Sequence, residues 1–167
     1  LAIATPAAQA VAGITSDIPV VGTAITDFAA SGLVDSNDAP GGNVTGSSDL
    51  TPVEAQINLL KKVCPDAKTV GILYCSAESN SVIQFAMAKE ACEKAGLKYE
   101  EFAVANSNEI QSVVESSVGK VDALYTPTDN TIAAGMSTVV MVANDNKLPV
   151  IAGEEGMVTS GGLCTYS

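Results

Sequence analysis

The chain has 167 residues, of which 47% are hydrophobic, and it carries a net charge of −11 with no histidine. The hydrophobic content excludes a disordered chain, and the apolar runs are too short to span a bilayer. Eight basic against 19 acidic residues disfavour binding to nucleic acid or to anionic membrane surfaces. Without histidine, Ser-His-Asp and Cys-His catalysis are excluded, and a zinc site would need cysteines.

The first 42 residues predict one incomplete lobe. A short apolar run at 1–4 is followed by Thr5-Pro6, which is typical of a helix start with Thr as N-cap and Pro at the first helical position. The next strand is expected at 18–24, which completes a βαβ unit with parallel pairing. The stretch around Pro40-Gly41-Gly42-Asn43 is rich in turn residues, so we expect it to link two lobes.

Residues 43–162 predict a complete α/β domain. Two capping boxes, Thr51 with Glu54 and Ser81 with Gln84, predict helix starts. Strands alternating with helical patterns of roughly ten to fifteen residues indicate a parallel open sheet with helices on both faces. Beyond the segment that begins at Val44, strands are expected at 69–74, 97–104, 121–126, 148–152 and 163–166. We assign residues 163–167 to the start of a return crossover.

The four cysteines are spread along the chain without a C-x-x-C pair, at Cys64, Cys75, Cys92 and Cys164. Their neighbours are small or apolar. This pattern favours buried free thiols, with a disulfide framework or a metal site as the alternative. We therefore predict no metal ligand and no cofactor.

A strand that breaks into a polar turn organises the middle of the chain. Ala123-Leu124-Tyr125 suits a buried parallel strand, Pro127 ends the pairing, and Thr128-Asp129-Asn130 can cap the next helix. In open α/β sheets, ligands bind at such junctions. Two readings stay open, because these polar residues can contact a ligand or can only cap a helix.

The polar turns after the strands are expected to meet at one edge of the sheet. Helix N-termini at that edge suit a carboxylate, while Asp129, Glu154 and Glu155 suit an ammonium group, so an amino acid would satisfy both. Alternatively, Glu154 and Glu155 only follow the preference of acidic residues for helix N-termini, and Asn80 only serves a turn. Asp129 with Glu154 lacks a nucleophile or metal partner, so no catalytic residue is predicted.

Several motifs together resemble one known family. They are Thr5-Pro6-Ala7-Ala8-Gln9, Pro40-Gly41-Gly42-Asn43-Val44-Thr45-Gly46, Thr126-Pro127-Thr128-Asp129-Asn130-Thr131 and Gly153-Glu154-Glu155-Gly156-Met157. In this order they resemble the ABC-transporter substrate-binding proteins of the tryptophan/tyrosine-type group, which have the type I periplasmic-binding-protein fold. The similarity runs through essentially the whole chain.

The resemblance implies two Rossmann-like three-layer lobes, here with the first lobe incomplete, that close on a small ligand in the cleft between them. The ligand would be a hydrophobic or aromatic amino acid delivered to an ABC permease, and the protein would be extracytoplasmic, either periplasmic or lipid-anchored. Either Asp129 or Glu154 would hold the ligand ammonium. By this likeness the ligand contacts are Thr5, Pro6, Ala7, Ser79, Asn80, Thr128, Asp129, Asn130 and Glu154.

The chain also departs from that pattern. Family members usually carry Asn after the strand tyrosine, where this chain has Cys75. The chain begins at Leu1 and stops inside a strand-like run, which predicts a fragment whose open sheet edges favour association with a second copy. The alternative function is a ligand-sensing domain of a signalling or regulatory protein with the same fold.

Overall fold

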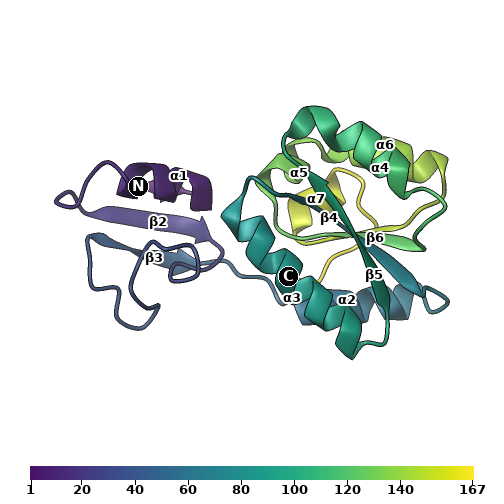
Figure 1. Cartoon of the computed structure of the whole chain (residues 1–167), viewed down its shortest axis with the longest axis horizontal. Helices are drawn as coiled ribbons and strands as arrows, with labels where there is room; N and C mark the ends of the chain where they lie inside the picture. Colours follow the sequence, from purple (N-terminus) through teal and green to yellow (C-terminus); the bar gives the residue numbers. More distant parts are fainter. The chain divides into compact units, whose positions relative to one another are not determined.

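The computed structural model describes the whole chain, Leu1–Ser167, and divides into two compact units (Figure 1). The N-terminal unit comprises Leu1–Leu50 together with Glu78–Asn80. The C-terminal unit comprises Thr51–Ala77 and Ser81–Ser167. Each unit has its own parallel sheet and its own hydrophobic core, and each is described separately below.

The N-terminal unit is a three-stranded parallel sheet in the order β1-β2-β3. Its elements are β1 (Ala2–Ile3), α1 (Thr5–Ala12), β2 (Val20–Ile25) and β3 (Val44–Ser48). Side chains on one face of the sheet pack with α1 and with the loop after β2, in a cluster formed by Ala2, Ala8, Val20, Ile25, Phe28, Leu33 and Val44. The parallel βαβ unit predicted for this segment is therefore present.

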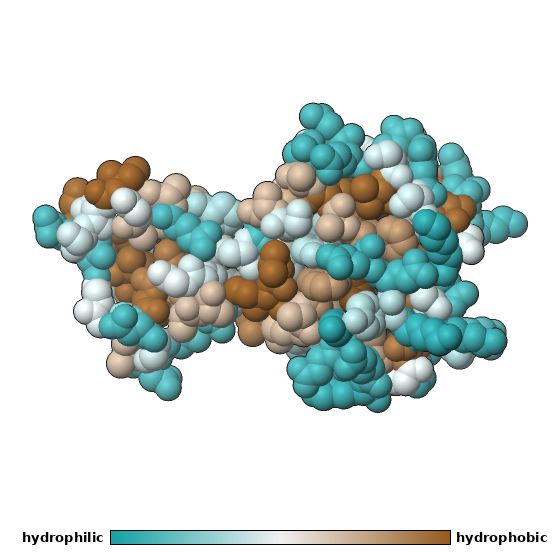
Figure 2. Space-filling model, viewed as in Figure 1, coloured by the Kyte–Doolittle hydropathy of each residue, from teal (hydrophilic) through white to brown (hydrophobic).

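The opposite face of this sheet is not covered within the unit. Side chains alternate between the two faces of a strand, so Ile3 and Val21 point away from the core and are exposed. Figure 2 shows hydrophobic surface over this unit, which exposes seven large apolar residues: Leu1, Ile3, Val11, Ile14, Ile18, Val21 and Leu50. The unit thus has only one of the two helical layers of a complete α/β lobe.

The boundary between the units lies eight residues later than the sequence predicted. Residues from Asn43 onward were assigned to the second lobe, but β3 pairs with β2 in register Val20↔Val44 and belongs to the first unit. The turn-rich segment before β3 is held within that unit, because the Asn43 amide donates hydrogen bonds to the carbonyls of Thr15 and Ile18, at 3.0 and 2.8 Å. The division falls instead between Leu50 and Thr51.

The C-terminal unit is a three-layer α/β domain with a parallel sheet in the order β5-β4-β6-β7. Helices α2 and α3 cover one face, and α4 to α7 cover the other (Figure 1). The strands are β4 (Thr69–Cys75), β5 (Lys98–Val104), β6 (Ala123–Thr126) and β7 (Val150–Ala152). The helices are α2 (Val53–Val63), α3 (Ser79–Lys94), η1 (Ser107–Glu109), α4 (Ile110–Ser117), α5 (Asn130–Ala134), α6 (Met136–Asp145) and α7 (Glu155–Thr159).

Burial on both faces explains why strands β4, β6 and β7 are nearly continuous apolar runs, whereas the edge strand β5 carries charged residues. On β4, Val70 and Ile72 belong to the core cluster under α2 and α3, whereas Leu73 and Cys75 belong to the cluster on the other face. A strand buried on both faces reads as a continuous apolar run. None of the helices is both long enough and apolar enough to cross a membrane.

Three of the predicted helix caps, those by Thr5, Thr51 and Ser81, are not formed. Thr5 is the first residue of α1 rather than its N-cap, which is Ala4. Helix α2 begins at Val53 without a side-chain cap, and Thr51 Oγ1 lies 3.2 Å from Thr128 Oγ1 instead. Helix α3 begins two residues before Ser81. These side chains are not available as caps, because the tertiary structure gives them other positions or partners.

The last residues extend the sheet by a short segment rather than a full strand. Cys164 pairs in parallel with Ile151, its carbonyl accepts the N–H of Ala152 at 3.0 Å, and the N–H of Leu163 donates to the carbonyl of Val150 at 2.8 Å. The strand predicted at 163–166 is thus reduced to one pairing. The return crossover proposed for 163–167 stays a prediction, and these residues group with the C-terminal unit.

Candidate functional site

The start of α1 is an uncapped helix N-terminus with a buried hydroxyl group. Strand β1 passes into α1 through Ala4, whose φ of +70° lies in the left-handed region that side chains disfavour. Thr5 is 1% exposed, its Oγ1 has no hydrogen-bond partner, and no side chain caps this helix. A buried unpaired hydroxyl destabilises the fold, and a helix N-terminus attracts anions. This end of α1 is therefore suited to a ligand carboxylate, with Pro6 and Ala7 exposed beside it.

The N-terminal unit has no basic side chain that could bind such a carboxylate. The chain has no arginine, and all eight basic residues are lysines at positions 61–147, outside this unit. Recognition of an anion by the unit must therefore use backbone N–H groups and hydroxyls, which α1 supplies.

The predicted residues Ser79 and Asn80 lie at the start of α3, in the segment that groups with the N-terminal unit. The Ser79 hydroxyl donates to Gln9 Oε1 at 3.2 Å, and the Gln9 amide donates to the Ser31 carbonyl at 2.9 Å. Asn80 is 2% exposed, and its amide donates to Glu78 Oε2 at 3.3 Å. Glu78 is 8% exposed and was missed by the sequence analysis, although a carboxylate in a turn after a strand was a usable signal.

In the C-terminal unit, the turns after β6 and β7 lie against each other. A Cβ atom on Gly153 would lie 2.4 Å from the backbone carbon of Pro127 and 2.5 Å from the nitrogen of Thr128. Only a glycine allows the two turns to approach so closely. Thr128, Asp129 and Glu154 therefore lie along the same edge of the sheet, at the carboxyl ends of parallel strands, as the sequence predicted.

Asp129 connects this edge to the neighbouring strand. It is 2% exposed, its Oδ1 accepts the N–H of Ile132 at 2.8 Å, and its Oδ2 accepts the N–H of Cys75 at 2.6 Å. The first bond caps α5, and the second holds the end of β4. The capping interpretation of Asp129 is realised, and the carboxylate has in addition a bracing role that the sequence did not reveal.

Glu154 is the N-cap of α7. Its two oxygens accept the N–H groups of Gly156 and Met157, each at 2.6 Å. The side chain is half-buried, while Glu155 is exposed in the first turn of the helix. The acidic residues of this turn thus follow the preference of carboxylates for helix N-termini, and Glu154 is also reachable from solvent.

Thr128 and Asn130 complete the predicted set. The Gln84 amide donates to the Thr128 carbonyl at 2.9 Å, and Gln84 Oε1 accepts the Thr128 N–H at 3.3 Å. Asn130 is exposed at the first position of α5.

The sequence analysis missed Thr126, whose Oγ1 is buried without a hydrogen-bond partner at the end of β6. Thr126 and Thr5 are therefore alike, since each presents an unpaired hydroxyl at the end of a strand.

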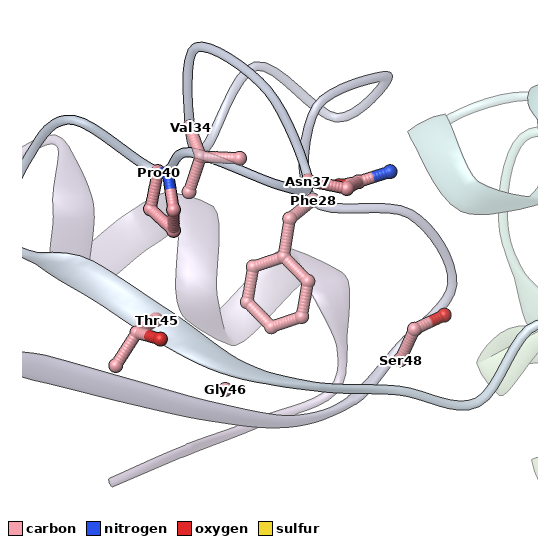
Figure 3. Close-up of a pocket in the computed structure, with 7 residues that line it drawn as sticks. All are labelled: Phe28, Val34, Asn37, Pro40, Thr45, Gly46 and Ser48. Carbon is pink, nitrogen blue, oxygen red and sulfur yellow. The ribbon is translucent and has the colours of Figure 1, made fainter.

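A small cavity of about 190 Å³ in the N-terminal unit lies between the loop after β2 and strand β3 (Figure 3). The ring of Phe28 lines it, with Val34 and Pro40 on one side of the ring and Ser48 on the other. Asn37 lines it, but its side chain is already hydrogen-bonded to Asp27 and to the N–H of Ala29. None of the predicted ligand residues lines this cavity.

No group of three or more His, Cys, Asp or Glu side chains is arranged to hold a metal ion. The predicted ligand residues of each unit instead offer neutral donors or capped carboxylates. Such an arrangement can bind a small dipolar molecule.

Comparison with known proteins identifies the family. The model of the ABC transporter substrate binding protein family matches residues 1–167. The chain is 44% identical to a tyrosine-binding protein from Clostridioides difficile strain R20291 over 97% of its length and 47% of that protein.

Two solved structures extend the comparison. An ABC domain from Streptococcus pneumoniae in complex with L-Trp is 47% identical, with a TM-score of 0.95 over 99% of this chain and 58% of that one. The ligand-free, open structure of a substrate binding protein with adhesive properties from Clostridium difficile is 45% identical, with a TM-score of 0.70 over 96% of this chain and 55% of that one. The chain spans about half the length of these relatives.

These similarities confirm the predicted α/β fold of type I periplasmic binding proteins, with an incomplete first lobe. They also confirm the resemblance found in the motifs of the sequence. The chain belongs to the family of ABC transporter substrate binding proteins.

Proposed function

We propose that the protein binds an aromatic L-amino acid and delivers it to an ABC permease. The observation that carries this proposal is the buried, unpaired Thr5 hydroxyl at the uncapped N-terminus of α1, in a unit without basic residues. The relatives support the ligand class, because one is named a tyrosine-binding protein and another was crystallised with L-Trp.

The carboxylate of the ligand is assigned to the start of α1. Thr5 Oγ1 donates to it, the N–H of Ala7 adds a second donor, and Pro6, which has no N–H, sets the first turn of the helix. Ser79 and Asn80 are further polar contacts of the N-terminal unit. Hydrogen bonds to a charged group contribute about 1.5–3 kcal/mol each, which is sufficient for recognition without arginine.

The ammonium group of the ligand is assigned to the acidic edge of the C-terminal unit. Glu154 makes the direct contact, because it is half-buried and its two oxygens can accept bonds beyond those from Gly156 and Met157. Asp129 holds the turn in place through Cys75 and Ile132 and adds its negative charge. Thr128 and Asn130, beside them, are assigned to polar contacts with the ligand.

Calorimetric titration with a matched set of ligands tests these assignments. L-Trp and L-Tyr should bind, whereas tryptamine lacks the carboxylate and indole-3-propionate lacks the ammonium group. Thr5→Val should weaken L-Trp binding roughly tenfold or more without lowering stability, because the hydroxyl has no partner to lose. Ser31→Ala, which removes another unpaired buried hydroxyl of the same unit, should leave the affinity unchanged.

The outcomes test the carboxylate contact and the ammonium contact independently. If Thr5→Val weakens L-Trp and tryptamine equally, the hydroxyl does not contact the carboxylate. If Glu154→Gln weakens L-Trp but not indole-3-propionate, the ammonium contact is supported. The absence of heat with every aromatic amino acid would refute the ligand class.

The remaining parts of the proposal concern reaction and location. The family consists of binding proteins, and we expect the ligand to be recovered unchanged after incubation, as chromatography of the released amino acid would show. We expect an extracytoplasmic location, periplasmic or lipid-anchored at the cell surface. Protease accessibility on intact cells or spheroplasts checks this, and protection of the protein until lysis would contradict it.

A further inference from the structure

The four cysteines fall into two pairs with different surroundings. Cys75 and Cys92 are fully buried, and burial raises the pKa of Cys92 to about 11. Cys64 and Cys164 are only partly buried, and all four are free thiols. The second pair can therefore be reached by a reagent in solution, whereas the first pair is shielded by the core.

Cys64 is the C-cap residue directly after α2 and is half-buried. Its N–H donates to the carbonyl of Leu60 at 2.8 Å, so it follows that residue by one helical turn. Leu60 is fully buried in the core cluster beneath α2 and α3, which also contains Ile151 of β7. Cys64 therefore lies one turn beyond a residue of the buried face of α2.

Cys164 reaches the same place from the sheet. It pairs in parallel with Ile151 and packs against the same core cluster. Two residues further on, the carbonyl of Tyr166 accepts the Gln56 amide at 2.9 Å, near the start of α2. The Gln56 amide also donates to the carbonyl of Gly153, just after β7, whereas Cys64 lines a pocket with Pro149, just before β7, so α2 runs antiparallel to this strand. Cys164, which pairs with Ile151 of β7, therefore lies beside the later turns of α2.

The two thiols also interact electrostatically. The pKa of Cys64 is raised, first by burial and second by the nearby Cys164. Strand pairing and packing bring both residues to the region between the end of α2 and the segment after β7, and the electrostatic interaction agrees with this placement.

We propose that Cys64 and Cys164 form a disulfide bond when the protein meets an oxidising environment. The oxidant is itself a disulfide, such as oxidised glutathione or a thiol oxidoreductase. One Cys thiolate attacks the oxidant's S–S bond and releases a thiol. The second Cys thiolate then attacks the mixed disulfide and releases the other thiol. Two protein thiols thus lose two electrons and two protons to the oxidant, and one S–S bond replaces another.

Such a bond would tie the segment after β7 to α2 and would close a loop of 99 residues, from position 65 to position 163. Long closed loops restrict the unfolded chain most. We therefore expect the oxidised protein to melt roughly 5–10 °C above the reduced protein. The inference does not depend on the identity of the ligand.

Peptide mapping tests the pairing directly. The purified protein is incubated with oxidised and reduced glutathione, alkylated, and digested with trypsin without reduction. Cleavage after Lys62 and Lys68 isolates Cys64 in the peptide 63–68, and cleavage after Lys147 starts the peptide that contains Cys164. These two peptides should appear linked, while the peptides with Cys75 and Cys92 stay alkylated.

The Cys64→Ser and Cys164→Ser variants supply the controls. Each should abolish the linked peptide and the rise in melting temperature, while their reduced forms melt close to the reduced wild type. The proposal is overturned if both thiols remain alkylated, if they end as separate glutathione adducts, or if either pairs with another cysteine. Linked peptides without any rise in melting temperature would overturn the stabilising role alone.

Discussion

Replacing Asp129 by Ala should destabilise the C-terminal unit more than any exposed acidic substitution. The carboxylate accepts the N–H of Ile132 at 2.8 Å as the cap of α5, and it accepts the N–H of Cys75 at 2.6 Å at the end of β4. Loss of an N-cap costs about 1 kcal/mol. Leaving the buried Cys75 N–H without this acceptor costs a further 1–3 kcal/mol or so, which makes a total of roughly 2–4 kcal/mol.

Urea unfolding followed by tyrosine signals measures this loss of stability in the C-terminal unit. The chain has no tryptophan, and its four tyrosines all lie between positions 74 and 166, in the C-terminal unit. With a urea slope of about 2 kcal/mol per molar, the unfolding midpoint should fall by roughly 1–2 M. The unfolding midpoint of Asp129→Asn should lie between those of Asp129→Ala and the wild type, because the amide oxygen can still accept one of the two N–H groups.

Glu155→Ala is the matched control, since this acidic residue lies in the first turn of a neighbouring helix and is exposed. Its effect should stay within about 0.5 kcal/mol. If Asp129→Ala unfolds at the same urea concentration as Glu155→Ala, the carboxylate does not brace β4 and α5, and the reasoning is wrong. Loss of L-Trp binding with unchanged stability would instead assign Asp129 to direct ligand contact.

Three further predictions concern stability and pH. Gly153→Ala should strongly lower the melting temperature of the C-terminal unit and impair ligand binding, because the new Cβ atom would collide with the backbone of Pro127 and Thr128. Gly42→Ala is the control: no atom lies within 4 Å of its Cβ position, so its melting temperature should be nearly unchanged. Tyr125→Phe should cost about 1–2 kcal/mol in urea unfolding, since the buried hydroxyl donates to Gln56 at 2.7 Å. Two backbone N–H groups lower the pKa of Asp122 below its usual 3.8, so its stabilisation is complete above that pH and lost as pH falls further. The difference in unfolding free energy between wild type and Asp122→Asn should therefore shrink below about pH 4. A difference that stays constant with pH would contradict the assignment.

Continuous apolar runs carried most of the fold prediction. The expected strand at 69–74 corresponds to β4 at Thr69–Cys75, and the apolar residues at 123–125 form the buried β6. These predictions succeeded because strands buried on both faces need apolar side chains at every position. The parallel arrangement followed from the alternation of strands with helices.

Turns and caps were less predictable, because their polar side chains have several available partners. Thr51 and Gln84 have the spacing of capping residues, yet both contact Thr128. Likewise, the turn after Pro40 has the composition of a linker, yet the Asn43 amide holds it within the first unit. Local spacing shows that a side chain can cap a helix, whereas only the folded chain shows which acceptor or donor lies nearer.

The sequence by itself determined the α/β class, the parallel sheets and the set of polar residues at the strand ends, because burial constrains residue type position by position. The tertiary structure decided how those residues are used. It placed two turns in contact at Gly153, engaged Asp129 and Glu154 as caps, and left the Thr5 hydroxyl buried without a partner. Hydrogen-bond partners far apart in the chain depend on three-dimensional distance, which no local pattern encodes.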